Sequence, residues 1–151
     1  MDLSTPYLQT GALMTPLGII VHLEVPIASA LEGVRAALRA EGFGILTEID
    51  MQAAFKEKLA LDFQPYVILG ACNPALAYRA LSDDPAMGLL LPCNVTVEAD
   101  GAECSIVRLV DPMSLMATEA TGASSVVRDV ALDAQQRLSR VARQLRAAHA
   151  T

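Results

Sequence analysis

The sequence predicts a single α+β domain, with one mainly antiparallel sheet and helices packed on one of its faces. Several short segments alternate apolar and polar residues, as half-buried strands do. Other segments carry apolar residues at helical spacing. The chain has 151 residues, 53% of them hydrophobic and 19% charged, which suits one domain with a substantial core.

The beginning of the chain is set apart from this pattern. Pro6, Gly11 and Pro16 interrupt it, and no period is sustained. We therefore expect residues 1–17 to form an N-terminal arm or loop and residues 18–151 to form the domain.

The first strand and the first helix follow directly. Residues 19–24 alternate and predict a strand. Pro26 suits a helix start, and apolar residues then recur at helical spacing until Gly42 provides a left-handed stop.

A second strand is predicted over residues 45–50, where Ile45, Thr47 and Ile49 share one face. Asp50 is a natural cap for a short helix over residues 51–61. A third strand covers residues 66–72. It is apolar nearly throughout, which favours a central strand covered on both faces.

The second half begins with Asn73 and Pro74, a cap and a first helical residue for a short helix that reaches Leu81. Residues 91–98 and 103–110 predict a hairpin around Asp100-Gly101. Residues 113–122 are expected to connect this hairpin to a long final helix. Ser124 or Ser125 caps that helix, whose apolar stripe consists of Val126, Val127, Val130, Ala134, Leu138, Val141 and Leu145.

Charge and the missing signals narrow the possible partners and the compartment. The net charge is −6, and only 4% of the residues are aromatic, so we expect binding neither to nucleic acid nor to a membrane surface. The first residues lack the basic start and apolar run typical of a secretory signal, and no apolar run in the sequence is long enough to span a bilayer. A cytoplasmic protein with reduced cysteines is the simpler expectation.

Cofactor and metal motifs are also missing. Gly42-Phe43-Gly44 lacks the third glycine of a dinucleotide fingerprint and precedes a strand. No pair of cysteines has the spacing of zinc ligands. We therefore expect neither a cofactor nor a metal.

The candidate site is a group of strand ends next to prolines: Cys72-Asn73, Cys93 and Asp111. Cys72 precedes a helix start, whose amides and dipole favour a thiolate, and Cys93 begins a neighbouring strand. Three interpretations stay open: core packing, a reactive or ligand-binding thiol, and a metal site. Asp111 is more simply a cap, although it could serve the thiol region.

His22 is the remaining candidate. It lies on the polar side of the first strand, on an open face or at a dimer contact.

Four segments together resemble the domain-of-unknown-function family 302. They are GFGILTEID with AFK at residues 42–56, ILGACNP at 68–74, GLLLPCNV at 88–95 and Asp111-Pro112. The resemblance covers residues 20–116 and implies an α+β fold that dimerises, with no established activity. The recurring cysteine positions of the family match Cys72 and Cys93, and Cys104 has no counterpart.

These observations lead to a predicted binding or carrier module that uses Cys72, Asn73, Cys93, Asp111 and His22 for a small ligand. Sulfane sulfur, a thiol or a soft metal would be such a ligand. A small cysteine-dependent enzyme and a purely structural or interaction protein are the alternatives.

A homodimer is also expected. One face of the sheet is left uncovered, and Ile20, Leu46, Tyr66 and Ile68 would lie on it.

Overall fold

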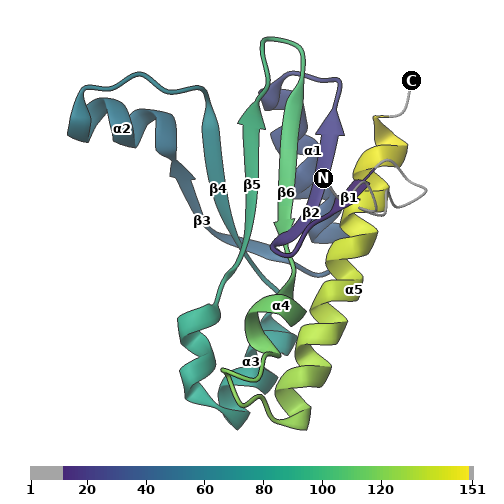
Figure 1. Cartoon of the computed structure of the whole chain (residues 1–151). Helices are drawn as coiled ribbons and strands as arrows, with labels where there is room; N and C mark the ends of the chain where they lie inside the picture. Colours follow the sequence, from purple (N-terminus) through teal and green to yellow (C-terminus); the bar gives the residue numbers. More distant parts are fainter. Residues whose placement is uncertain (1–11, 150–151) are drawn as a thin grey trace, which may run out of the picture.

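Six antiparallel strands form one sheet in the order β1-β2-β6-β5-β4-β3 (Figure 1). The structure is a computed structural model and describes residues 12–149. It confirms the predicted α+β class. The strands are β1 (Ala12–Met14), β2 (Gly18–Leu23), β3 (Gly44–Asp50), β4 (Tyr66–Cys72), β5 (Cys93–Ala99) and β6 (Ser105–Val110).

The helices begin at capping residues that the sequence largely identifies. Side chains of Asp50, Asn73, Asp111 and Ser124 each accept a hydrogen bond from a backbone N–H in the first turn that follows. Ser124 therefore caps the last helix, and Ser125 is its first residue. The helices are α1 (Ile27–Ala40), α2 (Met51–Leu59), α3 (Pro74–Asp83), the 3-10 helix η1 (Pro85–Leu90), α4 (Pro112–Met116) and α5 (Ser125–Ala148).

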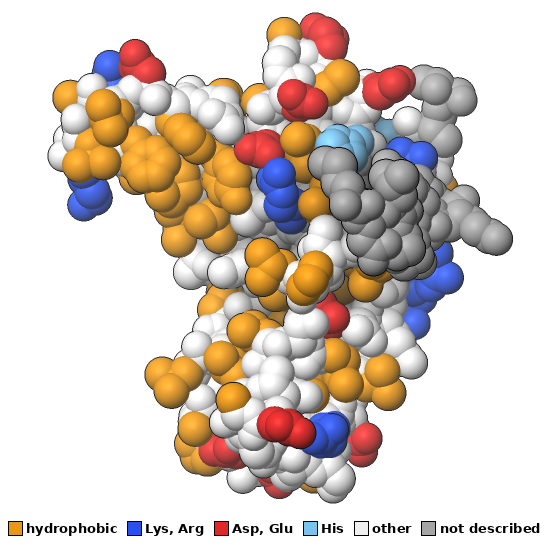
Figure 2. All heavy atoms as spheres, in the orientation of Figure 1, with side chains coloured by type: hydrophobic (Ala, Val, Ile, Leu, Met, Phe, Trp, Pro, Cys, Tyr) orange, Lys and Arg blue, Asp and Glu red, His pale blue; other side chains and the backbone are white. Residues whose placement is uncertain are grey.

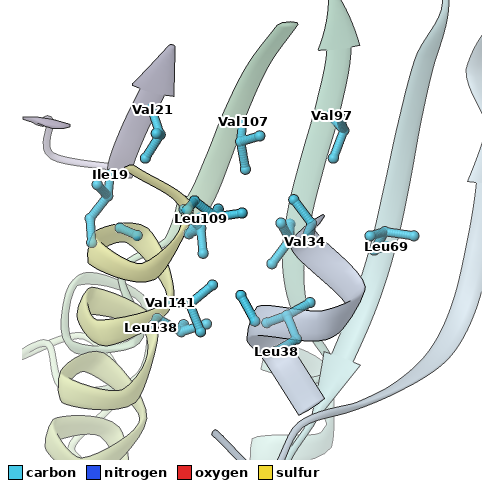
Figure 3. Close-up of a cluster of buried hydrophobic side chains, with 14 of the residues drawn as sticks. Ile19, Val21, Val34, Leu38, Leu69, Val97, Val107, Leu109, Leu138 and Val141 are labelled. Atoms are coloured by element: carbon cyan, nitrogen blue, oxygen red, sulfur yellow. The ribbon is translucent and has the colours of Figure 1, made fainter. Parts of the chain in front are cut away.

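The main core lies between one face of the sheet and helices α1 and α5 (Figure 3). Alternate residues of the inner strands point toward these helices, and helix residues at helical spacing meet them. The labelled side chains in Figure 3 are Ile19, Val21, Leu69, Val97, Val107 and Leu109 from the strands, with Val34, Leu38, Leu138 and Val141 from the helices.

A second core lies beyond the end of the sheet. There the first half of α5 packs against α3, η1 and α4 (Figure 1). Its buried members include Leu76, Met87, Met116 and Val130. The helix α4 and the helix η1 are additions to the predicted elements, because both are too short to show a helical period.

Among residues 12–149, no helix covers the other face of the sheet (Figure 1). The prediction that β4 is covered on both faces is therefore wrong. Tyr66 and Ile68 of β4 are only half-buried on this open face. Helix α2 stands apart from the other helices at the far end of β3 and β4, and none of its residues is buried.

Two local predictions need correction. Residues 12–14 form strand β1 within the predicted arm, because they pair with β2; residues 1–11 lie outside the described part of the chain. In β3 the pairing register shifts between Ile45 and Thr47. This shift turns Ile45 toward the core, while Thr47 and Ile49 stay on the open face.

No helix among residues 12–149 is long and apolar enough to cross a membrane.

Candidate functional site

A hollow lies on the open face of the sheet. It has a volume of about 570 Å³ and is lined mainly by apolar groups. Its lining residues are Thr15–Ile20 at the start of β2, with Tyr66, Asn94, Thr96, Arg108, Leu109 and Val110 from the neighbouring strands. Ligand pockets in proteins usually measure roughly 300–1,000 Å³, so this hollow has the size of a small-molecule site.

The rim of the hollow is a tight turn between β1 and β2. Thr15 donates its hydroxyl to the Gly18 carbonyl at 2.9 Å, and the Gly18 N–H donates back to Thr15. The Asp111 N–H donates to the Leu17 carbonyl at 2.9 Å and ties the turn to the end of β6. Leu17 is 83% exposed and lines the hollow, so the rim presents an apolar side chain to solvent.

One row of side chains crosses the open face from edge to edge. The strand registers place its six members directly opposite one another: Leu13, Ile20, Arg108, Thr96, Ile68 and Ile49. The two polar members stand in the middle of the row, and aliphatic side chains flank them on both sides. This pattern suits a molecule that is apolar at its ends and polar at its centre.

Arg108 is held in place by Glu98. Its Nη1 donates to Glu98 Oε1 at 2.6 Å, and Gln64 Nε2 donates to the other carboxylate oxygen at 3.2 Å. The Glu98 side chain is 11% exposed and that of Arg108 is 42% exposed. The ion pair therefore has a buried acidic end and a basic end that reaches solvent beside the hollow.

Thr96 carries an unusual polar group. Its hydroxyl oxygen is buried and has no hydrogen-bond partner among the described residues. An unsatisfied buried hydroxyl lowers the free energy of unfolding by about 1–3 kcal/mol. Such a group therefore calls for an explanation, for example a bound molecule that supplies the missing partner.

The predicted thiol pair is brought together. Cys72 and Cys93 line one small pocket with Asn73 and Leu76, and its room of about 20 Å³ admits roughly one water molecule. Burial raises the pKa of Cys72, and burial followed by repulsion from Cys72 raises the pKa of Cys93 to about 11. This direction is the reverse of the lowered pKa that the helix start predicted, and its cause is desolvation by burial.

Asn73 and Asp111 act as caps. Asn73 Oδ1 accepts a hydrogen bond from the Leu76 N–H at the start of α3. This backbone N–H is therefore not available to stabilise a Cys72 thiolate. Asp111 Oδ1 accepts from the Met113 N–H and from Gln135 Nε2, both at 2.9 Å.

The second Asp111 oxygen accepts from the Ser114 hydroxyl. Both oxygens of this carboxylate are thus engaged in holding α4 and α5.

His22 lies far from the thiols. The registers connect it through Ile106 and Glu98 to Tyr66, at the opposite end of β4 from Cys72. With ~3.3 Å per residue along β4, the separation is ~20 Å before the width of the sheet is added. His22 cannot transfer a proton to or from Cys72 at this distance.

Sequence reasoning missed Thr96, Glu98 and Arg108. Their signal was present, since Thr96 and Glu98 occupy the polar side of an alternating strand and Arg108 the same side of the next. Only the pairing of β5 with β6 shows that they meet. Among residues 12–149, no three His, Cys, Asp or Glu side chains come together in a way that could hold a metal ion.

Comparison with known proteins adds a family to this geometry. A family model described as Domain of unknown function DUF302 matches residues 19–145. The chain is similar to the crystal structure of an uncharacterized conserved DUF302 protein from Bacillus stearothermophilus, with a TM-score of 0.72 and 27% identity over 83% of this chain and 94% of that chain. No curated protein matches the chain.

Proposed function

The chain belongs to the DUF302 family of unknown function, and from the geometry of its open sheet face we propose that it is a binding module for a small, mostly apolar molecule. The observation that carries this proposal is the hollow of about 570 Å³ on that face. Its rim is a hydrogen-bonded turn, so the hollow is pre-formed rather than assembled by the ligand.

Apolar burial supplies the driving force. A ligand that loses about 200 Å² of apolar surface to this lining gains roughly 5 kcal/mol before the cost of association. This gain alone would correspond to a dissociation constant of about 200 μM, and the cost of association weakens binding from that figure.

The test uses dimethylaminonaphthalene, an uncharged apolar dye whose fluorescence anisotropy rises when it binds to a protein. Wild-type protein should raise the anisotropy in a saturable manner, and Ile20→Trp should abolish the rise because its ring fills the hollow. Ile106→Trp is the matched control, since Ile106 lies on the same face outside the lining. Equal binding by both variants would place the dye elsewhere and refute the proposal.

A second role, self-association, is favoured by the α2 arm, which we define as residues 46–63. Its apolar side chains Leu46, Ile49, Leu59, Leu61 and Phe63 are 40–66% exposed. Edge-to-face packing of Phe55 on Phe63 stiffens the arm without covering it. Hydrophobic side chains gather visibly over α2 and the adjoining strands in Figure 2.

The partner that we propose for the α2 arm is a second copy of the chain. The arm carries two lysines and four acidic residues, so its net charge is −2, and Arg35 of α1 is paired with one of these acidic residues, Glu48. A second copy therefore brings an apolar surface with little net charge to a surface of the same kind.

Light scattering at micromolar concentration should give twice the chain mass of 16.0 kDa. Leu61→Glu should return the protein to the monomer mass. Leu89→Glu should leave the dimer intact, because Leu89 is 89% exposed but lies in η1, away from the arm. A wild-type mass of one chain would refute the dimer.

The thiol pair remains a narrower proposal. The pocket of about 20 Å³ at Cys72 and Cys93 restricts any cargo to atomic size, such as one sulfane sulfur on Cys72. A cysteine-dependent enzyme has less support, since His22 lies at the other end of the sheet and both oxygens of Asp111 are engaged.

A further inference from the structure

The chemistry at the centre of the hollow selects the kind of ligand. Arg108 and Thr96 stand opposite each other on β6 and β5, and both line the hollow. Ile20 and Ile68 flank them in the same row. Of these four residues, Ile20, Arg108 and Thr96 line the hollow, and Ile68 lies outside its lining. A molecule in the hollow therefore meets hydrocarbon at Ile20 and the polar pair beside it.

Arg108 offers hydrogen-bond donors with little free charge. Among residues 12–149, Glu98 is the hydrogen-bond partner of its guanidinium, through Nη1 alone. The remaining N–H groups are left to solvent or a ligand, and the Arg108 side chain is 42% exposed. The carboxylate at 2.6 Å neutralises the guanidinium, so the pair as a whole is uncharged.

Thr96 is the second, independent indication. Its hydroxyl is buried without a partner, directly opposite Arg108. The centre of the row therefore holds a guanidinium with N–H groups that lack an acceptor in the described structure, beside a hydroxyl that no described residue satisfies.

We propose that the hollow takes an uncharged, mostly apolar molecule with one carbonyl group, and that Arg108 donates to the carbonyl oxygen. The inference rests on the proposed function and deepens it. A carboxylate ligand is disfavoured, because it would add a negative charge next to the buried Glu98 in a chain of net charge −6. A carbonyl oxygen accepts the same hydrogen bond without that repulsion.

Three probes with the same ring test this inference: prodan, which carries a ketone; its naphthoate analogue, which carries a carboxylate; and dimethylaminonaphthalene, which carries neither. Wild-type protein should bind prodan at least about fivefold more tightly than either of the others, which is the effect of roughly one net hydrogen bond. In Arg108→Met, the affinity for prodan should fall to that for dimethylaminonaphthalene.

Glu98→Gln provides a test that does not depend on loss of binding. With the carboxylate removed, the charge of the guanidinium is no longer balanced by a neighbour, and naphthoate binding should strengthen at least about fivefold. Glu103→Gln is the matched control, because it removes the same charge from the exposed β5–β6 turn. It should leave the order of the three probes unchanged.

The outcomes distinguish a failure of the carbonyl inference from a failure of the proposed binding function. Equal affinity of wild-type protein for prodan and naphthoate, or no gain in Glu98→Gln, would overturn the carbonyl inference while leaving the hollow as a binding site. Failure of all three probes to bind wild-type protein would overturn the proposed function itself.

Discussion

The Arg108 guanidinium and the Glu98 carboxylate lie diagonally across the β5–β6 pair, with Nη1 donating to Oε1 at 2.6 Å. The two ends of this ion pair differ in environment. Glu98 is 9% exposed as a residue, whereas the Arg108 side chain reaches solvent beside the hollow. Losing one partner therefore has a different consequence from losing the other.

Arg108→Met should lower the free energy of unfolding by about 2 kcal/mol, because it leaves a buried carboxylate with Gln64 alone. Glu98→Gln should cost less than about 1 kcal/mol, since the guanidinium can be hydrated. Urea denaturation of both variants and of the double variant measures the asymmetry. A larger loss in Glu98→Gln would contradict it.

Thr96→Val should raise the free energy of unfolding by about 1 kcal/mol. It replaces a buried hydroxyl that has no partner among the described residues with a methyl group of similar size. Thr121→Val is the control and should be destabilising, because the Thr121 hydroxyl donates to the Met116 carbonyl at 2.8 Å. Thermal and urea unfolding of the two variants should move in opposite directions; a loss in both would mean that the Thr96 hydroxyl has a partner.

Gly18→Ala should lower stability by about 3 kcal/mol and disturb the hollow. A Cβ atom there would overlap the Leu109 carbonyl oxygen across the β2–β6 pair, and backbone atoms cannot move aside cheaply. Gly88→Ala, where the nearest atom to the new methyl group is a leucine methyl at 3.6 Å, should stay within about 0.5 kcal/mol of wild type. Calorimetry of both variants checks this contrast, and equal stability would show that β2 can shift.

Cys93 should make the protein less stable at high pH. Its pKa of about 11 in the folded state exceeds the ordinary thiol value of 9.0, so the folded protein holds this proton more tightly than the unfolded chain does. The stabilisation is present below pH 9 and is lost as the pH rises through 11, by about 3 kcal/mol in total.

The measurement compares unfolding of wild type and Cys93→Ala between pH 8 and pH 11, because tyrosine and lysine titration is common to both. The variant should lose less stability across this range. In native protein, alkylation of Cys93 at neutral pH should be slow for the same reason. Fast labelling there, or identical pH profiles, would show that the thiol ionises readily.

Local chemistry determined most of the secondary structure. Asn73-Pro74 and Ser124 mark helix starts, and the stripe from Val127 to Leu145 faces the core as its spacing predicts. Caps and periods act over a few residues, so the sequence alone reports them. The adjacency of Cys72 and Cys93 also follows from their positions at the ends of neighbouring strands.

Tertiary structure decided which residues meet across the sheet. Ile20 lies beside Arg108 because β2 pairs with β6, a contact between distant parts of the chain that no local period encodes. Strict alternation had predicted that Ile45, Thr47 and Ile49 share one face. The register shift next to Ile45 instead turns this residue to the opposite face from the other two. Burial, which depends on all neighbours at once, raises the pKa of Cys72, whereas the helix start alone had favoured a thiolate there. The hollow is lined by residues of several paired strands, including Thr96 and Arg108. It therefore forms only when the strands are in register.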